Sequence, residues 1–234
     1  MSVSHSDSAK TYAKPGRPLI VVDNPHCYAV ISLQGAHLVE FNRKNTGGEA
    51  PTPFLWLSPN ADFTRGTVIR GGIPICFPWF GPQARNAELP KHGFARLRDW
   101  VLSNTVETAQ STKLHFTLNS DDRTLQVYPY VFTAELFFTL GKTLTIKLNV
   151  TNHSDSTMPV SWAFHSYFPV SDTAQTSVPE LSGLKYCDKT DNSNAETMTP
   201  TITAIARSVA TVTADTRIRT MASVRGTLRM TRKL

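Results

Sequence analysis

A chain of 234 residues with 40% hydrophobic residues is long enough to bury the core of one large domain. It contains no run of 18 apolar residues, which excludes a membrane-spanning helix. The formal net charge is +6, but seven basic and three acidic residues in segment 190–234 account for +4 of it, so the first 189 residues are close to neutral.

The N-terminal residues 1–17 are polar and Ser-rich and lack the apolar stretch of a secretory signal, so we expect this segment to be disordered. Three cysteines, Cys27, Cys76 and Cys187, are scattered along the chain without metal-ligand spacing. An odd and sparse set of cysteines favours a reducing compartment over a disulfide framework. We therefore expect a cytoplasmic protein with no membrane partner.

From residue 19 onward, short strands dominate the predicted structure. Five segments combine alternating polarity with β-branched residues: 19–22, 28–31, 113–118, 132–138 and 143–150. In the last of these, Leu144, Ile146, Leu148 and Val150 share one face, as in a half-buried antiparallel strand. Turn signals such as residues 119–122 separate the runs, and no convincing amphipathic helix precedes residue 188. The pattern predicts an all-β sandwich or barrel.

Three motifs lie between these strands and indicate a binding site. Residues 70–82 (R-G-G-I-P-I-C-F-P-W-F-G-P) are too apolar for a surface loop, yet include two adjacent glycines, three prolines and an arginine. Such a segment forms a rigid turn that brings a cation beside aromatic walls. Residues 91–96 (K-H-G-F-A-R) add a histidine and two cations, and residues 164–168 (F-H-S-Y-F) add a second histidine. Together they indicate a pocket for a small, polar, anionic ligand.

The three motifs, in this order, resemble those of the hexose-6-phosphate mutarotases, or glucose-6-phosphate 1-epimerases, of the aldose 1-epimerase (galactose mutarotase) superfamily. The match runs from about residue 18 to about residue 188 and includes L-Q-G-A-H at 33–37 and L-W-L-S-P at 55–59. It implies a galactose mutarotase-like antiparallel β-sandwich, the supersandwich, over residues 18–189. It also implies cofactor-free interconversion of the α and β anomers of glucose 6-phosphate and related hexose 6-phosphates.

The same resemblance assigns roles to five residues. His165 is implied to be the general acid, and histidine suits this role because its ordinary pKa is about 6.5. Arg70 and Arg96 are implied to bind the phosphate, since a guanidinium group matches a phosphate with two parallel hydrogen bonds. Lys91 either contacts the phosphate or faces solvent, and His92 either contacts a sugar hydroxyl or is structural.

Other histidines are expected to be structural. His37 follows Gly35 and Ala36 in a core-like motif and is expected to be packed rather than catalytic. No His-x-His or Glu-x-x-His pattern occurs in the sequence, so no zinc or iron site is expected.

The C-terminal segment departs from the resemblance. All 22 aromatic residues lie at or before Tyr186, and residues 190–234 are rich in Thr, Ala and Arg. We expect this basic tail to be disordered and the sandwich to be incomplete at its C-terminus. The family's catalytic glutamate has no matching motif, and Glu196, the only glutamate after Glu180, is not assigned its role. Two explanations fit the unusual composition and the missing glutamate motif. We favour a shift of reading frame soon after Asp188, and the alternative is a genuinely divergent tail.

Two rival interpretations stay open. A non-catalytic protein that binds sugar phosphates or other carbohydrates would keep the sandwich and the phosphate site but lack the general base. A fragment that does not fold stably would expose unpaired strand edges and apolar core. Nucleic-acid binding by the tail is disfavoured, because the tail has no aromatic side chains on which bases could stack.

Overall fold

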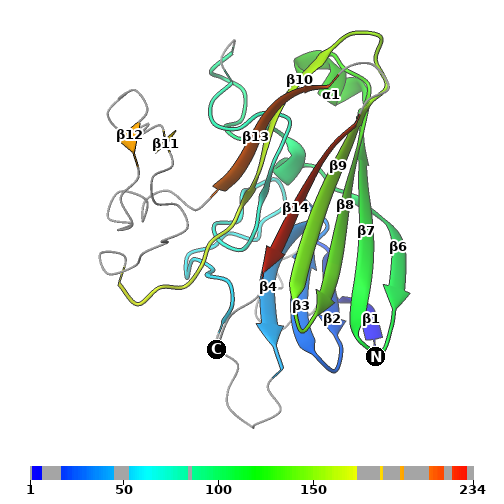
Figure 1. Cartoon of the computed structure of the whole chain (residues 1–234), viewed down its shortest axis with the longest axis vertical. Coiled ribbons are helices and arrows are strands. Elements are labelled where there is room, and N and C mark those ends of the chain that lie inside the picture. The colour runs from blue at the N-terminus through cyan, green and yellow to red at the C-terminus, as the bar shows by residue number, and fades with distance from the viewer. Residues whose placement is uncertain are drawn as a thin grey trace.

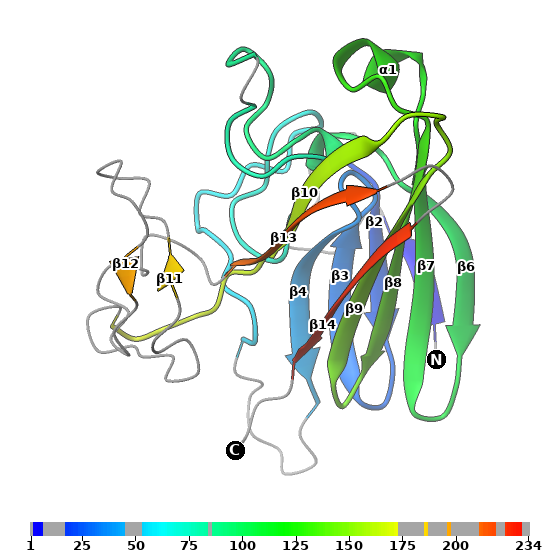
Figure 2. The ribbon, with the colours of Figure 1, turned by 45° about the horizontal axis from the view of Figure 1, so that its top comes forward.

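The structure, a computed structural model, describes residues 17–44, 53–83 and 86–172, together with the backbone of five strands at 2–6, 185–186, 196–197, 211–218 and 223–230. Antiparallel strands dominate, and two sheets of four and five strands stack on one another (Figure 1; Figure 2). The predicted all-β sandwich is confirmed. No helix in the described part of the chain is long and apolar enough to cross a bilayer.

The larger sheet has five strands in the order β14-β9-β8-β7-β6. They are β6 (Val101–Glu107), β7 (Ser111–Asn119), β8 (Phe132–Gly141), β9 (Leu144–Asn152) and β14 (Ser223–Met230). Along β9, buried and half-buried residues alternate from end to end, with Leu144, Ile146, Leu148 and Val150 inside. The alternation read from the sequence therefore describes the two faces of this sheet correctly.

The smaller of the two stacked sheets has four strands in the order β1-β2-β3-β4. They are β1 (Ser2–Ser6), β2 (Leu19–Asp23), β3 (Cys27–Ser32) and β4 (His37–Arg43). The register between β3 and β4 shifts at Val30 and Ile31. β4 also meets the segment that holds the glycine-proline motif, because Leu38 forms an antiparallel bridge with Ile73.

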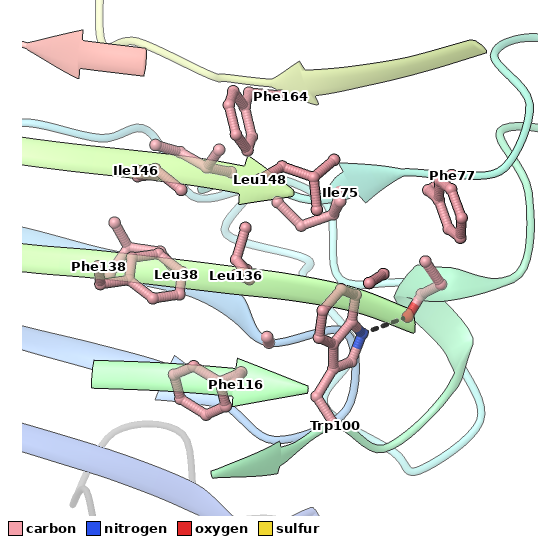
Figure 3. Close-up of a cluster of buried hydrophobic side chains, with 14 of the residues drawn as sticks. Leu38, Ile75, Phe77, Trp100, Phe116, Leu136, Phe138, Ile146, Leu148 and Phe164 are labelled. Atoms are coloured by element: carbon pink, nitrogen blue, oxygen red, sulfur yellow. Dashed lines mark hydrogen bonds between the residues drawn. The ribbon is translucent and has the colours of Figure 1, made fainter. Parts of the chain in front are cut away.

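One cluster of buried hydrophobic side chains joins the two sheets. Figure 3 shows Leu38 of β4 together with Phe116 of β7, Phe138 of β8 and Ile146 of β9. Each fully buried side chain of this size contributes about 1.5–3 kcal/mol relative to exposure. Trp100 closes one end of the cluster, where its indole N–H donates to the carbonyl of Ala95 at 3.0 Å.

A third sheet positions the sequence motifs. Its three strands, in the order β13-β10-β5, are β5 (Ile75–Cys76), β10 (Met158–His165) and β13 (Thr211–Ile218). Ile75 pairs with Phe164, and Cys76 pairs with Ala163. The glycine-proline segment and the motif around His165 are therefore hydrogen-bonded neighbours, although about ninety residues separate them in the sequence.

Helical structure is confined to two short elements in the described residues: the 3₁₀ helix η1 (Ala95–Leu97) and α1 (Asp122–Val127). A turn was expected where α1 begins. The difference arises because Asp121 and Thr124 form a capping box: the Asp121 carboxylate accepts from the Thr124 N–H, and the Thr124 hydroxyl accepts from the Asp121 N–H, both at 2.8 Å. Six residues are too few to show amphipathic periodicity.

Four strands lie in the C-terminal part of the chain. Two are short, β11 (Lys185–Tyr186) and β12 (Glu196–Thr197), and pair with each other. The two longer ones join the main body, since β13 pairs with β10 and β14 pairs with β9. The remainder of the expected tail, like most of the expected disordered N-terminal segment, lies outside the described residues. The domain boundary after residue 189 stays a prediction.

Candidate active site

The glycine-proline segment is held against β4 by close backbone packing. Gly72 has a φ of 63°, and a Cβ atom at this position would lie 2.3 Å from the carbonyl oxygen of Leu38. Only glycine fits such an approach without displacing the strand. The Gly72 N–H donates to the carbonyl of Trp56 at 2.8 Å, and the Gly72 carbonyl accepts from the Tyr167 N–H at 2.9 Å. Through these two hydrogen bonds Gly72 connects the backbone at Trp56 with the backbone at Tyr167.

His37 holds the same segment through a hydrogen bond to its backbone. It is buried, and its Nε2–H donates to the carbonyl oxygen of Gly71 at 2.8 Å. Burial lowers the pKa of His37 to about 3, outweighing the opposing effect of that hydrogen bond. His37 is therefore neutral at physiological pH and acts as a packed, positioning residue in the structure.

His165 ends β10 and lies in an aromatic setting. Its backbone N–H donates to the carbonyl of Pro74 at 3.0 Å. Its ring stacks on Tyr167 with 5.0 Å between ring centroids, and it meets the His92 ring in an edge-to-face arrangement with 5.4 Å between centroids. Phe80 contributes a further ring at 6.4 Å. The imidazole is thus held between rings from three segments of the chain.

The charge on His165 depends on this surrounding. Burial lowers its pKa first, the nearby positive charge of Arg96 lowers it further, and a hydrogen bond to its own backbone opposes both. Its Nδ1 atom is buried and has no hydrogen-bond partner in another residue of the described part of the chain. The neutral imidazole is consequently favoured, chiefly because the ring is buried.

His92 faces the same site in a defined tautomer. The N–H of Gly81 donates to His92 Nδ1 at 3.2 Å, so in the neutral ring the proton lies on Nε2. The backbone of His92 has a φ of 67°, and its own N–H donates to the Gly81 carbonyl at 2.7 Å. Its ring also meets the edge of Phe80 at 4.8 Å. These contacts fix the direction of an N–H donor beside His165.

Arg96 lies in η1 and is the central cation of the site. It is half-buried, and one Nη2–H donates to the carbonyl of Lys91 at 2.5 Å. Its Nε is buried without a hydrogen-bond partner among the described residues. Burial lowers the pKa of Arg96, yet an arginine stays charged, and its field reaches His165 and Tyr167. A cation placed in this way can hold an anionic group beside the imidazole.

The other two predicted residues lie further out. Arg70 is exposed and directly precedes Gly71, and its charge is close enough to help lower the pKa of Tyr167, which burial raises. Lys91 is also exposed, and its carbonyl rather than its ammonium group is the contact to Arg96. The structure thus brings His165, His92 and Arg96 together, places Arg70 near Tyr167, and leaves Lys91 at the edge.

Two aromatic residues of this site were not predicted as functional. Tyr167 lies between His165 and Trp56, whose ring centroid is 5.9 Å from that of Tyr167. The side chain of Trp56 is 40% exposed, and its backbone N–H donates to the Tyr167 carbonyl at 3.0 Å. The two-residue spacing from His165 could have revealed Tyr167, because alternate residues of an extended segment share a face. Trp56 gives no such local signal.

The general base stays unassigned, and the side chain of Glu196, to which the role is not assigned, is not described. Glu196 is in β12, of which only the backbone is described. In the described part of the chain, no group of three or more His, Cys, Asp or Glu residues could hold a metal ion.

Comparison with known proteins agrees with this architecture. The family described as aldose 1-epimerase matches residues 18–218. A protein of Escherichia coli (strain K12), named as a candidate glucose-6-phosphate 1-epimerase, is 41% identical over 181 residues, or 77% of this chain and 58% of the relative. A protein of Cenchrus ciliaris with the same name is 34% identical over 172 residues, or 70% of this chain and 50% of the relative. The chain thus spans little more than half the length of these relatives.

Solved structures show the same fold. The crystal structure of a candidate mutarotase from Salmonella typhimurium has a TM-score of 0.71 at 35% identity, covering 85% of this chain and 65% of that chain. A galactose mutarotase related enzyme from Lactobacillus acidophilus has a TM-score of 0.59 at 23% identity, covering 78% of this chain and 63% of that chain, and shows the fold alone. The predicted galactose mutarotase-like sandwich is confirmed. Because the family match extends over residues 18–218, this protein belongs to the aldose 1-epimerase family.

Proposed function

We propose that this protein interconverts the α and β anomers of glucose 6-phosphate and similar hexose 6-phosphates. The observation that supports this most directly is the placement of His165 beside Arg96, inside walls formed by Tyr167, His92 and Phe80. Family membership and the names of the relatives support the sugar and its phosphate. A titratable donor next to a half-buried cation suits a polar substrate with an anionic end.

The reaction requires two proton transfers. A sugar ring opens when one group gives a proton to the ring oxygen and another removes the proton of the anomeric hydroxyl. The ring then closes on its other face, and the two groups exchange roles. We assign the acid to His165, and positioned proton transfer of this kind contributes roughly 10²–10⁴-fold.

Binding of the substrate phosphate would change the pKa of His165. The positive charge of Arg96 lowers the pKa of His165, and so does burial. A phosphate dianion bound to Arg96 would offset that charge and raise the pKa of His165 toward the working pH. Substrate binding would thereby increase the protonated fraction of the acid.

Arg96 and Arg70 form the proposed phosphate site. The half-buried Arg96 is oriented by the Lys91 carbonyl, and this contact uses only one of its five N–H donors, so donor capacity remains for a phosphate oxygen. The exposed Arg70 adds a second guanidinium group near Tyr167. His92 Nε2–H is proposed to contact a sugar hydroxyl, and Lys91 is proposed as a weaker contact to the phosphate.

A second candidate function is binding of a sugar phosphate without turnover. The observation that favours it is the absence of a glutamate motif after residue 180 apart from Glu196, which leaves the general base unassigned. Without a positioned base, water must accept the anomeric proton, and the rate should fall by roughly 10²-fold or more. This candidate keeps the phosphate site unchanged.

One assay separates the two candidates. NMR exchange spectroscopy on equilibrated glucose 6-phosphate measures anomer interconversion with the full chain, with His153→Asn, the same change at an exposed histidine outside the site, as the control. We expect His165→Asn to remove most of the catalysed exchange while glucose 6-phosphate still binds. Binding without exchange in the unmodified chain would establish the second candidate. Exchange that is unchanged in His165→Asn would refute the role of His165.

A further inference from the structure

We propose that a hollow on a different part of the surface binds a small phosphorylated molecule. This arginine hollow has a volume of about 360 Å³ and is lined by Gln34, Arg65, Gly66, Leu97, Arg98, Asp99 and Arg123. Its volume lies within the range of small-ligand sites, about 300–1,000 Å³. None of its lining residues belongs to the site around His165, and the proposal does not depend on the function assigned to that site.

Three arginines converge on the hollow from separate segments. Arg65 lies in the connection between β4 and β5, Arg98 directly follows η1, and Arg123 lies in α1. Because residues so distant in sequence converge here, the arrangement is a product of the fold rather than of a local run of basic residues. Arginine is the side chain best suited to hold a phosphate, which it meets with two parallel hydrogen bonds.

The charges in the hollow do not balance. Arg65 pairs with Asp99, and Arg98 pairs with Asp121. Arg123 is exposed and makes no ion pair or hydrogen bond with another residue whose side chain the structure describes. With Asp121 counted, three guanidinium groups meet two carboxylates, which leaves one positive charge in excess. An anion bound between them would gain charge-assisted hydrogen bonds with arginines already gathered there.

The wall of the hollow is held in place before any ligand binds. Gln34 is buried, its Oε1 accepts from the Gly66 N–H at 2.8 Å, and its Nε2 donates to the Thr67 carbonyl at 3.0 Å. The buried Arg17 also donates to the carbonyls of Thr64 and Thr67, at 2.6 and 2.8 Å. The loop that presents Arg65 is thus braced on both sides. A braced loop loses little conformational entropy on binding, which favours affinity for a small ligand.

Gly66 leaves the mouth of the hollow open. Its φ is 88°, and a Cβ atom built there would meet no other atom within 4 Å. Exposed backbone at such a position allows a ligand to approach the loop closely. Leu97, which also lines the hollow, supplies an apolar surface. The hollow therefore combines cationic groups with one apolar contact, which fits a phosphate ester better than a bare anion.

Inorganic phosphate is the first probe, titrated into the full chain by isothermal calorimetry at low salt. We expect Arg123→Gln to weaken phosphate binding about tenfold or more, the loss of a hydrogen bond between charged groups. The matched control is Arg43→Gln, which removes the same charge from β4, outside both sites, and should change the affinity less than twofold. Phosphate can also bind near Arg96. Arg70→Gln weakens only that site, so phosphate binding that persists in this variant reports on the arginine hollow.

A second variant is expected to strengthen phosphate binding instead of weakening it. Asp99→Asn removes the one carboxylate that lines the hollow and releases Arg65 from its ion pair. Removing one negative charge near the ligand should tighten phosphate binding about fivefold. Methyl phosphate and acetate form the other arms: methyl phosphate, a phosphate ester without a sugar, should bind at least as tightly as phosphate, and acetate should bind more weakly. The proposal is overturned if phosphate does not bind at millimolar concentrations or if Arg123→Gln and Arg43→Gln behave alike.

Discussion

His165 illustrates how burial, together with a neighbouring charge, sets the chemistry of a residue. The pKa of His165 is lowered by burial and by the charge of Arg96, whereas a solvated histidine would titrate near its ordinary value. The same guanidinium group is proposed to hold the substrate phosphate. If both statements hold, binding and acid catalysis are linked through one electrostatic contact.

Substitution of the two arginines tests phosphate recognition. Arg70→Ala and Arg96→Ala should each weaken the binding of glucose 6-phosphate by roughly 1.5–3 kcal/mol, and the binding of glucose should barely change. We expect the larger loss at Arg96, which is half-buried, than at the exposed Arg70. Calorimetry with both sugars provides the comparison. Equal losses for glucose and glucose 6-phosphate would show that the arginines only maintain the fold.

His37 predicts how stability depends on pH. Its native pKa of about 3 lies below the ordinary 6.5, so the unfolded chain takes up the proton first as the pH falls. The free energy of unfolding should therefore decrease from pH 6.5 toward pH 3, with a slope from His37 approaching about 1.4 kcal/mol per pH unit. The stabilising contribution is complete above pH 6.5.

Denaturant unfolding at several pH values checks this for the unmodified chain and for His37→Gln. The variant is expected to be less stable near neutral pH, because the bond to Gly71 is altered. It should also lose stability less steeply between pH 6.5 and 4.5, because one titrating group has been removed. Parallel curves for the two proteins would mean that His37 is not the group responsible.

At the scale of elements, the third sheet and the loop around His92 assemble the site. β5 contributes only two residues, yet its pairing with β10 determines which face of the glycine-proline segment meets His165. A parallel bridge between Phe77 and Gly93 holds the His92 loop against that segment. The positions of His165 and His92 are consequently set by backbone pairing between these segments.

Gly93 offers a direct test of this dependence. Its φ is 74°, and an added Cβ atom would lie 2.0 Å from the carbonyl oxygen of Phe77. Gly93→Ala should therefore lower the free energy of unfolding by about 3 kcal/mol or more and disturb His92. The matched control is Gly66→Ala, at a φ of 88° with nothing within 4 Å, where only conformational strain of about 1–2 kcal/mol is expected. Chemical denaturation measures both, and equal losses would contradict the argument from backbone contact.

For the whole molecule, the C-terminal strands connect the sheets to the site. β13 pairs along the full length of β10, from Met158 to His165, and β14 pairs with β9 from Leu144 to Thr151. Each covers a strand edge that would otherwise present unpaired N–H and C=O groups. The sequence, by contrast, predicts a boundary after residue 189 and a tail that adds little to the core.

Deletion of residues 190–234 decides between these views. If β13 and β14 protect the edges of β10 and β9, the shortened chain should melt at a lower temperature and aggregate more readily. Differential scanning calorimetry and light scattering report the two effects. An unchanged melting temperature would support the boundary after residue 189 instead.

Much of the sandwich could be read from local pattern. The alternation at 143–150 specified which residues of β9 are buried, and the strands expected near 19, 28, 113 and 132 are present as β2, β3, β7 and β8. Such patterns suffice because burial on one side of a pleated strand leaves a period of two in the sequence. Helix α1 was missed because its stability rests on a capping box and not on periodicity.

The three motifs, and the family resemblance that they carry, likewise predicted that His165, His92 and Arg96 belong to one site. Packing alone could reveal the rest: the stacking of Tyr167 on His165, the half-burial of Arg96, and the meeting of Arg65, Arg98 and Arg123 around one hollow. The physical reason is that a pKa shift or a cluster of charges depends on distances between residues far apart in the chain. Those distances arise when the sheets stack, and no local run of amino acids encodes them.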